Sequence, residues 1–272
     1  PVVDDFGQPL STGTPGEGLP AASLTPTPAP APEDGDSSTS PAVSVLFASG
    51  GTRTFTYSSQ VSVPTGDAAD WVAAQVRNAV RRRGAASLAL SGGSTPALML
   101  AGLVRRDVPR GQVTVWQVDE RVAPDGDPAR NAGLLDVLPL RRAQVRLMPV
   151  TARHLSSAVR RYAAGLPERF DVVHLGMGDD GHTASWPPGD PVIDSPSAVA
   201  LCGPYNGFVR MTLTPPVVNA ARHRLVLAPG AAKAGPMRRW LLEDRLLPIQ
   251  RVRRTATVVV IDAAAAAQLP AA

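Results

Sequence analysis

The sequence predicts an α/β protein in three layers, α/β/α, built on a mostly parallel sheet. Short apolar runs alternate with helical patterns from about residue 67 onward. The apolar runs are continuous, as in strands that are covered by helices on both faces. Several runs end in a glycine turn that leads directly into a helix, so we expect a Rossmann-like sheet.

The first half of the pattern contains two strands and two helices. Residues 53–63 alternate between apolar and polar side chains and predict a strand. Residues 67–83 place apolar side chains at helical spacing. Residues 86–90 form an apolar strand, and we expect the next helix to have Thr95 as its N-cap and Pro96 at its first position.

The second half is predicted to contain strands within 112–121, 145–150, 170–178, 208–213, 223–227 and 255–261. The first of these is expected to be one continuous strand. Helices are predicted at 154–166, after Thr214 with Pro215 at the first position, after the turn that holds Lys233, and at the C-terminal end.

The N-terminal segment differs from the rest in composition. Residues 1–50 are rich in Pro, Gly, Ser and Thr and contain few large apolar side chains. Such a segment cannot bury enough surface to offset the entropy lost on ordering. We therefore expect a disordered tail at 1–50 and a single α/β domain at 51–272, and we expect the protein to be a monomer.

Charge and cysteine content narrow the functional class. The net charge is +4 with a pI near 10, which is compatible with nucleic-acid binding. However, the densest basic cluster, Arg81–Arg83, ends a predicted helix, where cations suit the dipole, and no nucleic-acid-binding motif accompanies it. Cys202 is the only cysteine, so neither a disulfide within the chain nor a Cys-based zinc site is expected. Without a long apolar run or a signal-peptide pattern, we expect no membrane contact and a cytoplasmic location.

Polar residues follow four of the predicted strands. Because ligands of open α/β sheets bind beyond the carboxyl ends of the strands, these turns are expected to form one site. The stretch "SGGSTP" contains Gly92, Gly93, Ser94 and Thr95 directly before a helix, so its free amides and the helix dipole favour an anion such as phosphate. It lacks the Gly-Lys-Ser/Thr ending of a Walker loop and the spacing of the dinucleotide fingerprint.

Lys233 is the only lysine, beside 26 arginines. Its retention indicates a role for a compact point charge, and its position at the start of a helix is unfavourable unless an anion lies nearby. Arg121 and Arg210 could add bidentate contacts to a phosphate.

His182 follows a strand in the glycine-rich stretch "GMGDDGH" and can take a proton from water. No second His or Cys lies at metal-ligand spacing, so no metal is expected. Asp119, which follows the apolar residues of the strand predicted within 112–121, could orient this histidine or accept a substrate hydroxyl, and Asp180 is the alternative partner. Amides of the turn Gly178–Gly181 are candidates to stabilise an oxyanion. His174, inside the strand, is interpreted as a hydrogen-bonded core residue.

These motifs together resemble the 6-phosphogluconolactonase family. The matching pieces are "SGGSTP", "WQVDER", "DPARN", "FDVVHLGMGDDGHTAS", "RMTLTPPVVNAA" and "GAAKA", in the family's order over about residues 60 to 262. The family usually has Leu-Phe where Trp186 and Pro187 stand, so we expect the lip of the pocket to be reshaped.

The resemblance implies the fold shared with glucosamine-6-phosphate deaminase and ribose-5-phosphate isomerase. It also implies hydrolysis of 6-phospho-D-glucono-1,5-lactone to 6-phosphogluconate in the oxidative pentose phosphate pathway, with no metal, no cofactor and no covalent intermediate. The hypothesis assigns the catalytic roles to His182, Asp180 and Asp119. It assigns substrate and phosphate binding to Gly92, Gly93, Ser94, Thr95, Arg121, Arg210 and Lys233.

Two alternatives remain open at this point. One is an amino-sugar-phosphate deaminase–isomerase on the same fold, although that family tends to follow its histidine with a different segment. The other is a non-catalytic sugar-phosphate sensor joined to a DNA-binding module. The second needs a helix-turn-helix segment, which the proline-rich tail cannot form.

Overall fold

The computed structural model describes residues 45–47, 53–54, 65–141, 144–242 and 244–269. The predicted tail lies outside these residues as far as residue 44. The predicted strand at 53–63 is described only at its first two positions. Among the described residues, no helix is long and apolar enough to span a membrane.

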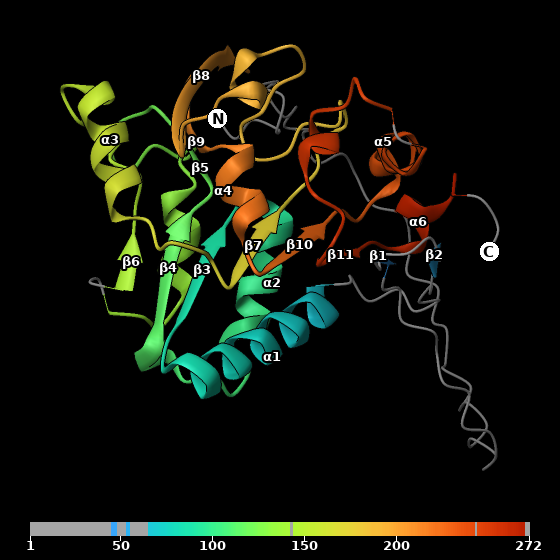
Figure 1. Cartoon of the computed structure of the whole chain (residues 1–272), viewed down its shortest axis with the longest axis horizontal. Coiled ribbons are helices and arrows are strands. Elements are labelled where there is room, and N and C mark those ends of the chain that lie inside the picture. The colour runs from blue at the N-terminus through green and yellow to red at the C-terminus, as the bar shows by residue number, and fades with distance from the viewer. Residues whose placement is uncertain (1–44, 48–52, 55–64, 142–143, 243, 270–272) are drawn as a thin grey trace, which may run out of the picture. The chain divides into compact units, whose positions relative to one another are not determined.

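The main sheet has the strand order β2-β1-β11-β10-β7-β3-β4-β6 (Figure 1). Its six strands from β11 to β6 are parallel to one another, and β1 joins β11 antiparallel, with β2 beside it. This confirms the predicted mostly parallel α/β sheet. The strands of this sheet are β1 (Val45–Phe47), β2 (Arg53–Thr54), β3 (Ala86–Leu90), β4 (Val113–Gln117), β6 (Val145–Arg146), β7 (Val172–Leu175), β10 (His223–Leu227) and β11 (Thr257–Val260).

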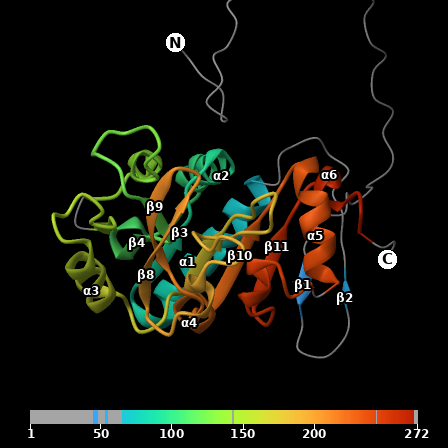
Figure 2. The ribbon, with the colours of Figure 1, turned by 90° about the horizontal axis from the view of Figure 1, so that it is seen from above.

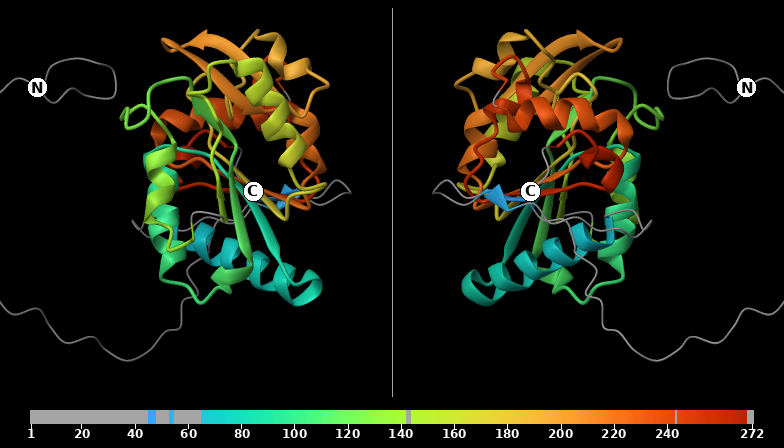
Figure 3. Two further views of the ribbon diagram at one scale, coloured as in Figure 1. Left: turned by 90° about the vertical axis from the view of Figure 1, so that its left-hand side faces the viewer. Right: turned by 90° about the vertical axis from the view of Figure 1, so that its right-hand side faces the viewer.

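Helices cover the sheet on both faces, which explains the continuous apolar runs. In β3, Leu88 packs in a core cluster with residues of α1 and α2, whereas its neighbour Ala89 belongs to the cluster on the opposite face. Figure 3 shows α1 and α2 on one side of the strands. In Figure 2, α3 lies near the β4–β6 end of the sheet and α5 and α6 near the β1–β2 end. The helices are α1 (Thr65–Arg83), α2 (Ser94–Val104), α3 (Leu155–Gly165), α4 (Pro215–Ala220), α5 (Ala234–Leu241) and α6 (Ala263–Ala266).

A second, antiparallel sheet has the order β5-β9-β8, with bounds Asp119–Arg121, Phe208–Leu213 and Val199–Tyr205. The prediction of one continuous strand over 112–121 is therefore wrong. Val118 is the junction, since its N–H donates to the carbonyl of Leu90 in the main sheet while its own carbonyl accepts from Leu213 in the small sheet. The chain passes from the main sheet to the small sheet at Val118. Asp119 and Arg121 therefore belong to the small sheet.

Two helix starts test the predicted caps. The helix after β3 begins at Ser94 and its N-cap is Gly93, with φ +111°, so the prediction of Thr95 as the cap is wrong. Gly93 takes a positive φ that other residues rarely adopt, which turns the chain two residues earlier than expected. Thr214 does occupy the N-cap position of α4, but its hydroxyl donates to the carbonyls of Ser197 and Ala198 rather than to the helix.

Candidate active site

A cavity of about 270 Å³ lies at the carboxyl ends of β3, β7 and β10, beside the small sheet. It combines the start of α2 with side chains from both sheets and from three turns. Asp180 is the one predicted site residue that does not line it. The predicted residues that do are Gly92, Gly93, Ser94, Thr95, Asp119, Arg121, His182, Arg210 and Lys233.

The glycine turn before α2 is fixed by close contact with a neighbouring loop. A Cβ atom on Gly92 would lie 2.0 Å from Oδ1 of Asn131, so only glycine fits there. The same Oδ1 accepts a hydrogen bond from Nη1 of Arg121 at 3.1 Å. The turn, the amide and the guanidinium are thereby packed into one wall of the cavity. At this wall the first turn of α2 presents amides that have no partner within the helix.

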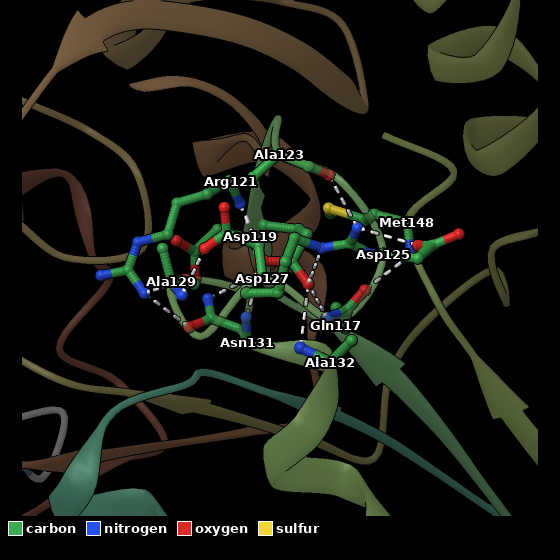
Figure 4. A network of polar contacts seen from close by, with 12 residues as sticks. Gln117, Asp119, Arg121, Ala123, Asp125, Asp127, Ala129, Asn131, Ala132 and Met148 are labelled. Carbon is green, nitrogen blue, oxygen red and sulfur yellow. Dashed lines mark hydrogen bonds and ion pairs between the residues drawn. The ribbon is translucent and has the colours of Figure 1, made fainter. Parts of the chain in front are cut away.

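A buried carboxylate holds that neighbouring loop in place. Glu120 is fully buried, and its Oε1 accepts from the amides of Arg121 at 2.8 Å and Asn131 at 2.7 Å. Its Oε2 accepts from the amide of Ala132 at 2.9 Å and forms an ion pair with Nε of Arg130 at 3.0 Å. Figure 4 shows this network around Asn131 and Ala132. Because a buried charge needs partners of this kind, Glu120 is a structural acid that sets where Arg121 and Asn131 lie.

Asp119 and Arg210 face the cavity from the small sheet. The Asp119 carboxylate accepts from the Ser185 hydroxyl at 2.6 Å, and among the described residues it forms no hydrogen bond or ion pair with His182. Burial raises the pKa of Asp119, while Ser185 and the nearby guanidinium of Arg210 act in the opposite direction. Burial also lowers the pKa of Arg210, assisted by the like charge of Arg121. Two guanidinium groups beside one largely buried carboxyl leave an excess of positive charge for an anionic ligand.

Lys233 reaches the cavity from the turn after β10. This turn is anchored by Asp262, whose carboxylate oxygens each accept from the amide of Gly230 at 2.9 Å. Gly230 has φ +101° and precedes the short 3-10 turn that ends at Lys233. The ammonium group forms an ion pair with Asp179, an acid from the turn after β7 whose side chain is 65% exposed. An exposed pair of this kind is weak, so a ligand phosphate can compete for the lysine.

His182 is oriented by Asp180, which resolves the alternative left open by the sequence. Oδ1 of Asp180 lies 2.6 Å from Nδ1 of His182 and also accepts from the His182 amide at 3.0 Å. Burial acts to raise the pKa of Asp180, but hydrogen bonds from His182 and from a tyrosine hydroxyl outweigh it and hold that pKa below its usual value. An ionised acceptor at Nδ1 places the proton there and leaves Nε2 as the basic atom. A Cβ on Gly178 would lie 1.9 Å from Nδ1, so glycine is required for the ring to fit.

Two of the four amides in the candidate oxyanion turn, those of Gly178 and Gly181, already have partners. The amide of Gly178 donates to the carbonyl of His182 at 2.8 Å, and the amide of Gly181 donates to Gly178 at 3.0 Å. These hydrogen bonds close the turn itself. Neither amide is therefore free to meet an oxyanion.

Three residues differ from the sequence-based expectation in their position, their hydrogen bonding or their contact with the site. Trp186 is fully buried and donates from its indole N–H to the carbonyl of Leu213 at 2.7 Å, so the departure at this position lies in the core and not at the lip of the pocket.

His174 is buried as expected, but neither ring nitrogen has a partner among the described residues, and burial lowers its pKa to about 4. Tyr205, which sequence reasoning missed, contacts both Asp180 and His182. The Asn206-Gly207 pair that follows it is a hairpin signal that could have shown this tyrosine at the end of a strand.

The fold and the cavity together define an α/β protein in which cationic side chains and an imidazole line one cavity. Residues 62–261 match the model of the family described as glucosamine-6-phosphate isomerases/6-phosphogluconolactonase. The match covers most of the chain, so the chain belongs to this family.

Relatives and a solved structure from this family are named 6-phosphogluconolactonase. The chain is 31% identical over 229 residues to a 6-phosphogluconolactonase of Pseudomonas aeruginosa, covering 78% of this chain and 96% of that protein. It is 32% identical over 177 residues to a 6-phosphogluconolactonase of Synechocystis sp., covering 60% of this chain and 74% of that protein. The crystal structure of a 6-phosphogluconolactonase from Shewanella baltica superposes with a TM-score of 0.67 at 28% identity, covering 74% of this chain and 93% of that one.

Proposed function

We propose that this chain hydrolyses 6-phospho-D-glucono-1,5-lactone to 6-phosphogluconate, as the names of its relatives suggest. One observation carries the proposal. A histidine whose Nδ1 is held by a carboxylate lines the same cavity as the lone lysine, Arg121, Arg210 and the start of α2. The substrate requires this pairing, since it carries a phosphate at one end and an ester carbonyl at the other.

The phosphate is held by the cationic wall. Lys233 exchanges its partner Asp179 for a phosphate oxygen, and the first amides of α2 add donors at the positive end of the helix. Arg121 and Arg210 face the remaining phosphate oxygens or the sugar hydroxyls. This fixes the lactone carbonyl relative to His182, and fixed geometry supplies much of the rate enhancement in such reactions.

The chemical step uses one water molecule and one histidine. Nε2 of His182 takes a proton from the water as its oxygen attacks C1 of the lactone, and the carbonyl electrons move onto the carbonyl oxygen. When the tetrahedral intermediate collapses, the bond from C1 to the ring oxygen breaks and Nε2 returns the proton to that oxygen. Asp180 stabilises the imidazolium between the two transfers. The free acid then loses its proton to solvent.

A coupled assay tests the function. Glucose-6-phosphate dehydrogenase generates fresh lactone, and the formation of 6-phosphogluconate is followed against spontaneous ring opening. We expect the purified chain to accelerate hydrolysis above that background and to release no ammonia from glucosamine 6-phosphate. Ammonia release without lactone hydrolysis would assign the chain to the deaminase branch of the family.

The monomeric state, the cytoplasmic location and the division at residue 50 remain predictions. Light scattering of the purified chain tests the first, and cell fractionation tests the second. For the third, a chain that starts at residue 45, and so keeps β1, is expected to keep full lactonase activity, and a chain that starts near residue 51 shows whether the domain needs β1. The absence of nucleic-acid binding is expected as well, and a gel-shift assay tests it.

A further inference from the structure

We propose that Tyr205 is a positioning residue, which holds Asp180 in the orientation that makes His182 a base and couples this pair to Arg210. The inference rests on the proposed lactonase function and extends it to a residue outside the predicted site.

The hairpin between β8 and β9 presents Tyr205 to the site. Asn206 and Gly207 form its two-residue turn with φ values of +47° and +78°, as a type I′ turn requires, and Tyr205 pairs with Phe208 across it. The register shifts between Cys202 and Tyr205, so β8 carries one extra residue there. Such a bulge re-aims the side chains beside it. The result is a tyrosine from the small sheet that reaches a turn of the main sheet.

The hydroxyl of Tyr205 lies against both members of the catalytic pair. It donates to Oδ2 of Asp180 at 2.7 Å and lies 3.0 Å from Nδ1 of His182. The other oxygen of Asp180 is the one that meets Nδ1, at 2.6 Å. The two carboxylate oxygens are therefore shared between the tyrosine and the imidazole.

The proton positions follow from these contacts. Burial, followed by the hydrogen bond to Asp180, raises the pKa of Tyr205 to about 12, so the phenol keeps its single proton at neutral pH. That proton points to Oδ2, because the carboxylate is ionised and Nδ1 already carries the proton that it donates to Oδ1. These contacts place the proton of the neutral imidazole on Nδ1, so Nε2 of His182 is its acceptor nitrogen.

Asp180 needs such support because it is not enclosed. Its side chain is 39% exposed, so water competes for Oδ2 and the carboxylate could rotate away from the ring. The hydrogen bond from Tyr205, which lies on another element, occupies Oδ2 and restrains this rotation. Partners of a catalytic pair that fix its tautomer and orientation act in this way without touching the substrate.

The aromatic ring links the base to the anion-binding wall. The guanidinium carbon of Arg210 lies 5.1 Å from the centroid of the Tyr205 ring, and Nε of Arg210 donates to the Tyr205 carbonyl at 3.3 Å. Arg210 is 4% exposed, so this cation–π contact is largely shielded from water. The hydroxyl and the ring face therefore have separable tasks. The hydroxyl orients Asp180 and His182, and the ring face packs against the guanidinium of Arg210.

Two substitutions separate these tasks. Tyr205→Phe removes the hydroxyl and keeps the ring face, so we expect kcat to fall about 3- to 10-fold with KM unchanged. Tyr205→Leu removes both, so we expect the same loss in kcat and in addition a rise in KM of about 2- to 5-fold from the loosened Arg210. Val209→Ala, an exposed change on the same hairpin, should alter neither constant.

A spectroscopic readout keeps the test independent of activity. Nitrogen–proton correlation of the histidine rings shows which nitrogen of His182 carries the proton, with its signals assigned by their loss in His182→Gln. We expect the wild type to carry it on Nδ1 and Tyr205→Phe to show a mixture of tautomers. Wild-type kcat together with an unchanged tautomer in Tyr205→Phe would overturn the inference. An inactive wild type that still shows the Tyr205-dependent tautomer would refute the proposed function alone.

Discussion

Positive charge lies at both ends of the parallel strands of the main sheet, the carboxyl edge and the amino edge. The surroundings of that charge differ between the two. The carboxyl edge has the cavity of about 270 Å³ with Lys233 and His182. The amino edge has a larger groove of about 930 Å³, lined by Arg83, Arg146, Arg161, Arg169 and Arg222. Volume and number of cations would favour the groove as the active site. The smaller cavity is nevertheless favoured, because it contains a histidine beside the start of a helix, whereas none of the described residues that line the groove is a histidine.

The difference follows from helix polarity. α1 ends at Arg83 and α3 ends at Gly165 beside the groove, so unpaired carbonyls and negative helix ends meet the arginines there. Asp171 neutralises part of the remaining charge through ion pairs with Arg83 at 2.5 Å and Arg222 at 3.4 Å. At the carboxyl edge α2 begins, and its positive end adds to the charge of Lys233. Helix ends therefore offset the positive charge at the amino edge and add to it at the carboxyl edge.

The largest expected effect is loss of the base at the carboxyl edge. His182→Ala should lower kcat by roughly 10²–10⁴, because general base catalysis contributes about that much. Binding of 6-phosphogluconate, measured by calorimetry, should persist since the cationic wall is intact. His154→Ala is the matched control, because His154 is an exposed residue at the start of α3. A variant of His182 with wild-type kcat would remove this residue from the mechanism.

The next effect separates binding from chemistry at the same edge. Lys233→Ala should raise KM roughly 10- to 100-fold with a much smaller change in kcat, because a charge-assisted contact to phosphate is lost. Arg238→Ala, which removes an exposed positive charge from α5, should leave KM unchanged. Steady-state kinetics at constant ionic strength measures both. Equal KM values for the two variants would place Lys233 outside the ligand contacts.

The amino edge should respond in stability and not in activity. The carboxylate of Asp171 accepts from the Ser87 amide at 2.8 Å and pairs with two arginines. Asp171→Ala should therefore lower the free energy of unfolding by about 1–3 kcal/mol in urea titration, with KM unchanged. Asp70→Ala, which breaks the exposed pair with Arg106, should cost less than about 1 kcal/mol. A rise in KM for the Asp171 variant would contradict the division of roles between the two edges.

The smallest effect concerns competition for the lysine. Asp179→Asn frees Lys233 from its carboxylate partner, so KM should fall by no more than about fivefold. The difference between wild type and variant should shrink as salt rises, because exposed pairs are screened. Kinetics at low and high ionic strength measures this. A raised KM would mean that Asp179 helps to hold the substrate.

Much of the fold could be predicted from local pattern. The strands of the parallel core are continuous apolar runs because helices cover both faces, and this is visible in residues 86–90 and 223–227. The short strands were harder to predict. β5 holds three residues, too few for any periodicity, and its separation from β4 depends on Val118 bonding to both sheets.

The candidate site was predictable where single residues carry unusual chemistry. The lone Lys233, the glycines before α2 and the histidine in a glycine-rich turn each departs from the composition around it. Tyr205 could not be identified this way, because its role depends on a bulge and a hairpin turn that aim it at another element.

The sequence alone determined the alternation of strands and helices in the parallel core, the glycines that let the backbone turn, and the residues able to carry charge and protons. These are local properties, set by side-chain periodicity and backbone freedom. The tertiary structure alone decided that Asp180 and not Asp119 meets His182, that Glu120 is structural, and that the amides of Gly178 and Gly181 are already occupied. Each of these depends on which atoms remain within hydrogen-bond reach once distant elements pack, and no spacing along the chain encodes that distance.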